Sequence, residues 1–189
     1  MDALPVVDLT AFLNDPSGSE GLAVVEELRR AAHEVGFVYL CGHGVDPNLD
    51  EAMFGTAREF FDLPEADLRA LAIEHSPAFR GYTILGDEVT NGRSDWRDQL
   101  DLGPEQPPPE HGPDDPAWMR LRGPNQWPAA LPTMAPTVLH WMAAMDDVGI
   151  TALRAHAVGL GLPIDHFDQG FLPESDVPLK IKRYPASTT

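Results

Sequence analysis

The stretch LKIKRYP, residues 179–185, alternates apolar and polar side chains, which is the pattern of a β-strand. Side chains two positions apart lie on the same face of a strand, so Lys180, Lys182 and Tyr184 share one face. These two lysines are the only ones in the chain. The pattern has two interpretations: a positive surface that attracts a carboxylate, or an edge strand that lysines protect from aggregation.

Upstream of this strand the sequence predicts the longest helix, over about 132–161, from apolar residues spaced three and four apart. Gly149 weakens that helix by roughly 1 kcal/mol relative to Ala. Residues 103–116 contain six prolines and cannot form regular structure. Before them, 82–85 and 99–102 are predicted as short strands or extended loops. A short helix is expected around 164–171.

The N-terminal part of the sequence predicts a strand over 4–9 and a helix from Ser19 that ends at Gly36. A short buried strand is expected over 37–40. Asp46 and Pro47 form an N-cap and first helical position for a second helix, and a shorter helix follows Pro64.

Composition excludes several classes of protein. The 189 residues include 30 acidic and 13 basic side chains, a formal charge of −17, and such a surface repels nucleic acid. No window approaches the length of a membrane span, and the N-terminus lacks the features of a secretory signal, so we expect a cytoplasmic protein. A single cysteine, Cys41, excludes an internal disulfide, and we expect it to be a small buried hydrophobic residue.

The seven histidines invite a metal site, but none can be assembled from them. They are His33, His43, His75, His111, His140, His156 and His166. The single H-x-D sequence, His166 to Asp168, is expected in a helix, where residues two apart point away from each other. His140 and His156 lie sixteen residues apart in the long helix, too far along its axis to share an ion. We expect His166 and Asp168 to be solvated surface residues.

Two further groups of side chains could carry chemistry. Asp95, Asp98 and Asp101 alternate with arginines, and we interpret them as an exposed, salt-bridged ribbon rather than as acid–base groups. In Phe79-Arg80-Gly81-Tyr82, Arg80 can bind a carboxylate with two hydrogen bonds while the glycine permits close approach, so an anion contact is one interpretation. Packing of Tyr82 against a surface arginine is the other.

The order of short motifs resembles the isopenicillin N synthase-like family of oxygenases. The motifs are LPVVDL (4–9), GFVYL (36–40) with GHGV (42–45), AREFF (57–61) before Leu63-Pro64, FRGY (79–82), GDE (86–88), DWRDQLDLG (95–103), GPNQWP (123–128) and the terminal KIKRYP. The resemblance covers essentially the whole chain. Members of this family are non-haem Fe(II) enzymes, most of which depend on 2-oxoglutarate.

The resemblance implies an α+β fold: a helical N-terminal lobe (1–128), then a long supporting helix and the first strands of a double-stranded β-helix, or jelly roll (129–189). It implies that Tyr184 contacts the cosubstrate, that the face carrying it looks inward, and that Arg80 and Tyr82 line a substrate pocket. The H-x-D and distal histidine that bind iron in the family are expected beyond Thr189. The implied function is Fe(II)- and 2-oxoglutarate-dependent oxidation of a small molecule, with this stretch alone inactive. The alternative is a naturally truncated, non-catalytic module that binds a partner through its open sheet edge.

Overall fold

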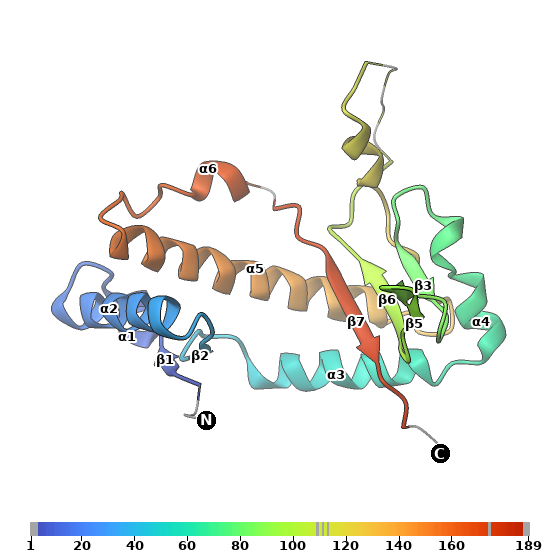
Figure 1. The fold of residues 1–189 in the computed structure, drawn as a ribbon, viewed down its shortest axis with the longest axis horizontal. Helices are drawn as coiled ribbons and strands as arrows, with labels where there is room; N and C mark the ends of the chain where they lie inside the picture. The colour runs from blue at the N-terminus through green and yellow to red at the C-terminus, as the bar shows by residue number, and fades with distance from the viewer. Residues whose placement is uncertain (1–3, 109, 111, 113, 174, 187–189) are drawn as a thin grey trace. The chain divides into compact units, whose positions relative to one another are not determined.

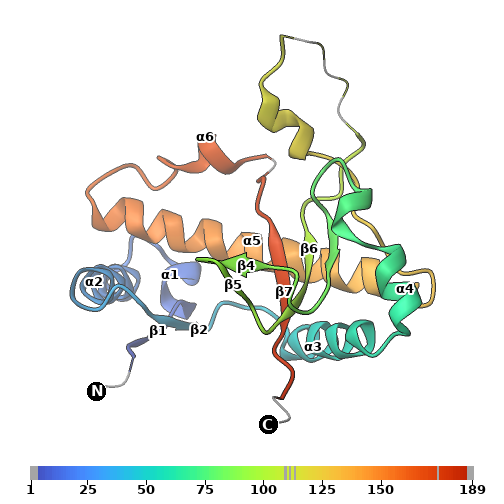
Figure 2. The same ribbon diagram turned by 45° about the vertical axis from the view of Figure 1, so that its right-hand side comes forward.

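The computed structural model describes residues 4–108, 110, 112, 114–173 and 175–186, shown in Figures 1 and 2. The chain forms two units, one from residues 1–46 with 143–175 and the other from 47–142 with 176–189. The predicted division at residue 128 concerns family regions rather than compact units and stays a prediction. His111 lies outside the described residues.

The first unit is mainly helical. Its apolar core gathers residues from the first strand, from the two helices after it and from the second half of the long helix, namely Val7, Leu9, Phe12, Val24, Val25, Leu28 and Ala155. Its elements are β1 (Val6–Asp8), α1 (Thr10–Asn14), α2 (Ser19–Glu34), β2 (Tyr39–Cys41), part of α5 (Met134–Gly159) and α6 (Asp168–Phe171). β1 and β2 pair in parallel, with Val7 opposite Leu40.

The second unit holds a three-stranded sheet in the order β3-β6-β7. Its elements are α3 (Pro47–Phe61), α4 (Glu65–Ala70), the 3₁₀ turn η1 (Ile73–His75), β3 (Gly81–Thr83), β4 (Val89–Thr90), β5 (Arg93–Ser94), β6 (Asp98–Leu102), the 3₁₀ turn η2 (Ala117–Leu121), the first part of α5, and β7 (Leu179–Arg183). Both neighbours of β6 are antiparallel to it, and β4 and β5 form a separate hairpin.

One face of this sheet forms the core of the second unit. Leu100 and Leu102 of β6 and Tyr82 of β3 pack with the buried side of α3 and with the start of α5. Phe60 is fully buried there, with ring contacts to both Phe61 and Tyr82. The described part of the proline-rich segment runs without a helix or strand until η2, and Figure 1 shows it extending away from the sheet.

Most predicted elements are present, with three corrections. The strand predicted over 37–40 begins at Tyr39 and is not buried, since Phe37 is 71% exposed and Tyr39 62% exposed. Cys41 is exposed, so the expectation of a buried thiol is wrong. The strand belongs to a two-stranded sheet and is half-buried: Val38 and Leu40 pack against the core of the first unit, while Phe37 and Tyr39 face outward.

The last correction concerns residues 164–171, where only the final turn, α6, is helical. Asp168 is not freely solvated, because Arg154 binds its carboxylate, with 2.6 Å between Nη2 and Oδ2. This ion pair lowers the pKa of Asp168. His166 is exposed, as expected.

Gly149 provides a test of the α5 assignment. A Cβ built at this position meets no atom within 4 Å, and the residue lies in the interior of the helix. Gly149→Ala should therefore raise the free energy of unfolding by about 0.5–1 kcal/mol, measured by urea titration with far-ultraviolet circular dichroism. Gly21→Ala is the matched control in the same unit: its Cβ would clash with the Asp15 carbonyl oxygen, so it should destabilise. Equal effects of the two changes would contradict the assignment.

Candidate functional site

The β3-β6-β7 sheet carries a second face that is polar. Gln99 of β6 lies between Thr83 of β3 and Lys182 of β7, and Asp101 pairs in the next row with Lys180. Residues opposite each other in a sheet share a face, so these side chains form one surface. We call this surface the polar face and define it by Arg97, Gln99, Asp101, Lys180, Lys182 and Tyr184.

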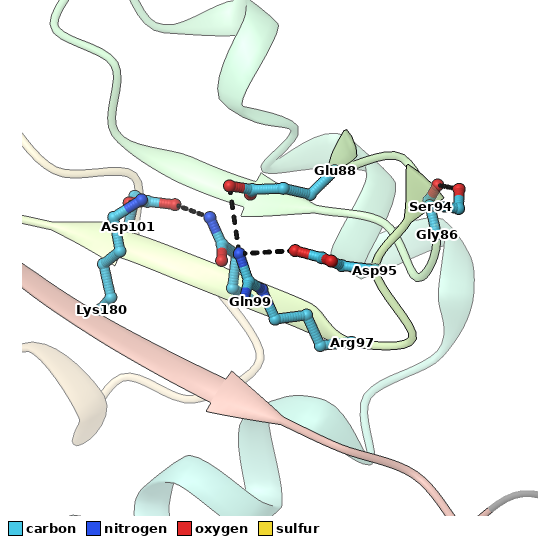
Figure 3. A network of polar contacts seen from close by, with 8 residues as sticks. All are labelled: Gly86, Glu88, Ser94, Asp95, Arg97, Gln99, Asp101 and Lys180. Carbon is cyan, nitrogen blue, oxygen red and sulfur yellow. Dashed lines mark hydrogen bonds and ion pairs between the residues drawn. The ribbon is translucent and has the colours of Figure 1, made fainter. Parts of the chain in front are cut away.

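Two members of the polar face are unusually buried for their chemistry. Gln99 is 2% exposed and Asp101 is 8% exposed. The Gln99 amide donates to Asp101 Oδ2 at 2.8 Å, and Lys180 Nζ lies 2.9 Å from Oδ1 of the same carboxylate (Figure 3). Within the described residues, the Gln99 Oε1 atom is buried and has no hydrogen-bond partner. Buried polar groups are normally paired, so this acceptor is an exception among the described residues.

Arg97 lies at the other end of the polar face. Its guanidinium lies 3.0 Å from Asp95 and 3.2 Å from Glu88, at the base of the β4–β5 hairpin (Figure 3). A hydrogen bond with the Tyr184 hydroxyl raises the pKa of Arg97, and the two carboxylates raise it further. The indole of Trp96 also donates to the Pro185 carbonyl at 3.2 Å. The chain after β7 therefore continues alongside β6, and Tyr184, 66% exposed, stands beside Arg97.

Asp98 lies on the opposite face, among the core residues, and is 1% exposed. Arg183 binds its carboxylate through Nη2 at 2.6 Å and Nε at 3.1 Å, and the Tyr82 hydroxyl donates to it at 2.9 Å. The predicted exposed ribbon is therefore wrong for Asp98 and Asp101, although the Asp95–Arg97 ion pair does form. The alternation in DQLDL could have predicted the burial of Asp98, because Asp98 shares a strand face with Leu100 and Leu102.

Asp98, Arg183 and Tyr82 form a cluster, the Asp98 cluster, that makes the free energy of unfolding depend on pH in the alkaline range. Burial and the hydrogen bond to Asp98 raise the pKa of Tyr82 to about 12. The folded state thus holds this proton more tightly than the unfolded state, so stability is complete below about pH 10 and declines between about pH 10 and 12. Tyr82→Phe should remove this part of the decline in urea titrations across that range. An unchanged profile would contradict the contact.

The structure does not bring the three predicted site residues together. Tyr184 belongs to the polar face, whereas Tyr82 belongs to the core face. Arg80 is 9% exposed, and its guanidinium lies against Gly103, where it fills the space that a Cβ would need. Ser76 and Gln126 bind the Arg80 backbone. Substrate contacts by Arg80 and Tyr82 stay predictions. Gln99 could not be identified from the sequence, because the strands on both sides bury it and its own neighbours in sequence do not.

An apolar groove of about 560 Å³ lies beside β7. It is lined by α3, Trp141 and all of β7, including Lys180, Lys182 and Arg183. β7 is the edge of the sheet within the described residues, so its outer backbone groups border this groove. The described residues contain no group of three His, Cys, Asp or Glu side chains placed to hold a metal ion, so they do not fit an iron site. None of the described helices is long and apolar enough to cross a membrane.

The helices and the small antiparallel sheet, with its one core face and one polar face, define an α+β protein. Residues 4–130 match the sequence family described as the N-terminal region of the non-haem dioxygenase in morphine synthesis. The chain therefore belongs to the non-haem dioxygenase family.

Named relatives agree with this assignment. The chain is 36% identical to the 2-oxoglutarate-dependent dioxygenase frbJ of Dothideomycetidae sp. (strain 11243), over 97% of this chain and 48% of frbJ. It is 29% identical to homoarginine-6-hydroxylase 2-ODD-C23.2 of Arabidopsis thaliana, over 96% of this chain and 52% of that protein. The chain thus spans about half the length of these curated relatives.

Solved structures show the same fold. A full-length Neurospora crassa protein, crystallised in complex with alpha-KG, superposes with a TM-score of 0.77 at 26% identity, covering 96% of this chain and 54% of that one. A 2OG-Fe(II) oxygenase family protein from Caulobacter crescentus superposes with a TM-score of 0.78 at 24% identity, covering all of this chain and 58% of that one.

Proposed function

We propose that this chain forms the N-terminal region and the first core strand of an Fe(II)- and 2-oxoglutarate-dependent oxygenase that oxidises a C–H bond of a small molecule in the cytoplasm. The observation that carries the proposal is the polar face. This face buries an amide and a carboxylate on the side away from the apolar core, which is uncommon because polar residues are mostly exposed.

The charges of the polar face suit the carboxylates of 2-oxoglutarate. Lys182 is exposed and makes no ion pair with the described residues, and Tyr184 lies beside Arg97, whose pKa it raises. In the proposal Tyr184 donates to a carboxylate of the cosubstrate and Lys182 supplies positive charge beside it. Oxidative decarboxylation of bound 2-oxoglutarate to succinate and CO2 would supply two of the four electrons that reduce O2, and the substrate C–H bond would supply the other two. Arg80 and Tyr82 are retained as proposed contributors to the substrate pocket.

The iron ligands are proposed to come from outside the described residues, as the family pattern implies. The open edge of β7 and the apolar groove beside it are proposed to be covered by the part of the enzyme that the relatives possess beyond the aligned half. That arrangement would place the polar face in an enclosed, water-poor cavity, where its charges bind anions more strongly than they do at a surface.

A chimeric enzyme tests the proposal. Residues 1–189 are joined to the part of frbJ that follows its aligned half, and Fe(II)-dependent conversion of 2-oxoglutarate to succinate is measured. Intact frbJ is the positive control, and the 189-residue chain alone is the negative control. Turnover by the chimera supports the proposal. A folded chimera that binds iron and produces no succinate would overturn it.

The alternative function, a non-catalytic module that binds a partner through the open edge of β7, rests on the same groove. The chimera experiment distinguishes the oxygenase function from the binding function. An interaction module has no requirement for a polar face competent in cosubstrate binding, so it predicts no succinate from a correctly folded chimera.

A further inference from the structure

We propose that the first unit carries a binding site for an apolar monocarboxylate, such as a medium-chain fatty acid, in a cavity between α2 and α5. The apolar body of the ligand would lie between the two helices, and its carboxylate would bind Arg29, with the imidazoles of His33 and His156 as further donors. This site shares no residue with the polar face, and it does not depend on the proposed function.

The cavity has a volume of about 670 Å³, which is within the range of pockets that bind small molecules. Its apolar lining comes from α2, from the end of α5 and from the segment after α5. These residues are Val25, Ala32, Leu153, Ala155, Gly159, Leu160 and Phe167. Figure 1 shows α2 alongside the second half of α5, and a Cβ built at Gly159 would lie 3.3 Å from the Val25 side chain. The cavity therefore lies between two closely packed helices of one unit.

The polar side chains that line the cavity are an arginine and two histidines, Arg29, His33 and His156. None of the described residues that line it is acidic, although the chain has 30 acidic residues against 13 basic ones. Asp168, next to Phe167 in the sequence, is paired with Arg154. A cleft lined by charge of one sign, with apolar walls, attracts a ligand of the opposite sign. The lining therefore complements a ligand with an apolar body and one negative group.

The three polar groups have donors available for a ligand. Arg29 binds the Glu26 carboxylate through Nε and Nη2, both at 2.8 Å, which leaves its Nη1. Both side chains of this pair are more than half exposed, so the pair contributes little and does not prevent a ligand carboxylate from binding Nη1. Neither imidazole has a hydrogen-bond or ion-pair partner in the part of the chain that the structure describes. An imidazole carries at least one N–H donor in either charge state.

Two probes test the site on the 189-residue chain. Octanoate and octan-1-ol are linear chains of the same length that end in a carboxylate and in a hydroxyl. Binding is measured by NMR titration of the ¹⁵N-labelled chain, in which the amides of Ala155 and Gly159 report on the cavity. We expect octanoate to bind roughly tenfold more tightly than octanol, because its carboxylate makes charge-assisted hydrogen bonds. Equal affinities, tighter binding of octanol, or titration that leaves these amides unshifted would overturn the proposal.

Charge variants on α2 test the anion contact. Arg29→Gln should bring the ratio of the two affinities close to one. Arg30→Gln is the matched control, because it removes the same charge from the next position, which is exposed and does not line the cavity. The control should preserve the ratio. Equal ratios in the two variants would overturn the assignment of Arg29.

A second pair of variants tests the cavity itself. Ala32→Phe places a large side chain in the lining and should abolish the binding of both probes. Ala23→Phe makes the same change at an exposed position of α2 outside the lining and should leave both affinities unchanged. Octanoate binding that survives Ala32→Phe would contradict the proposed location. The comparison of the two probes on the wild-type chain stands even if one of the variants fails to fold.

Discussion

Asp98→Ala should lower the free energy of unfolding of the second unit by about 3–5 kcal/mol, because it breaks a buried ion pair and leaves its partners behind. Arg183 would lose its carboxylate, and the Tyr82 hydroxyl would lose its acceptor. All four tryptophans lie in this unit, at positions 96, 118, 127 and 141, so urea unfolding followed by tryptophan fluorescence reports the change.

The matched control for this change is Asp176→Ala. Asp176 pairs with Arg122 at 3.1 Å, but both side chains are substantially exposed, at 43% and 38%. Surface pairs contribute about 0–1 kcal/mol, so the control should shift the unfolding midpoint only slightly. Similar shifts for the two variants would show that the Asp98 cluster is not a buried ion pair in solution.

Phe60→Ala should cost about 3–5 kcal/mol, because it empties the centre of the core on which the sheet rests. Phe60 has no exposed surface, and its ring lies 5.2 Å from that of Phe61 and 6.1 Å from that of Tyr82. Phe54→Ala, on the same helix, removes the same side chain from a position that is 63% exposed. The control should change stability by less than about 1 kcal/mol. A small effect at Phe60 would contradict the packing of α3 against the sheet.

Elements with a strong local pattern could be predicted from the sequence. The period of apolar residues located α5 to within two residues at each end, and the alternation in LKIKR located β7 and its two faces. The parallel pairing of β1 with β2 could not be predicted, because it joins residues 33 apart, such as Val6 and Tyr39. Nothing local encodes such a pairing.

Part of the candidate site could likewise be predicted from a local pattern, and part could not. The Lys180, Lys182 and Tyr184 face follows from β7 alone. Whether Gln99 and Asp101 are buried depends on which strands flank β6, and those strands come from opposite ends of the second unit. An acidic residue also has two opposite fates in a strand, an exposed ion pair or a buried one. The alternation with Leu100 and Leu102 places Asp98 on the core face, but its partner there, Arg183, comes from β7 and follows only from the strand register.

The Michaelis constant for 2-oxoglutarate in the chimera tests the central claim, that the polar face binds the cosubstrate. Tyr184→Phe removes one hydroxyl from that face and should raise this constant roughly tenfold, since hydrogen bonds to charged groups contribute about 1.5–3 kcal/mol. Tyr39→Phe removes the same group from a similarly exposed tyrosine, 62% against 66%, that lies in β2 and not in the β3-β6-β7 sheet. The account predicts a rise in the Michaelis constant for Tyr184→Phe alone. Identical constants for the two variants and the parent chimera would contradict it.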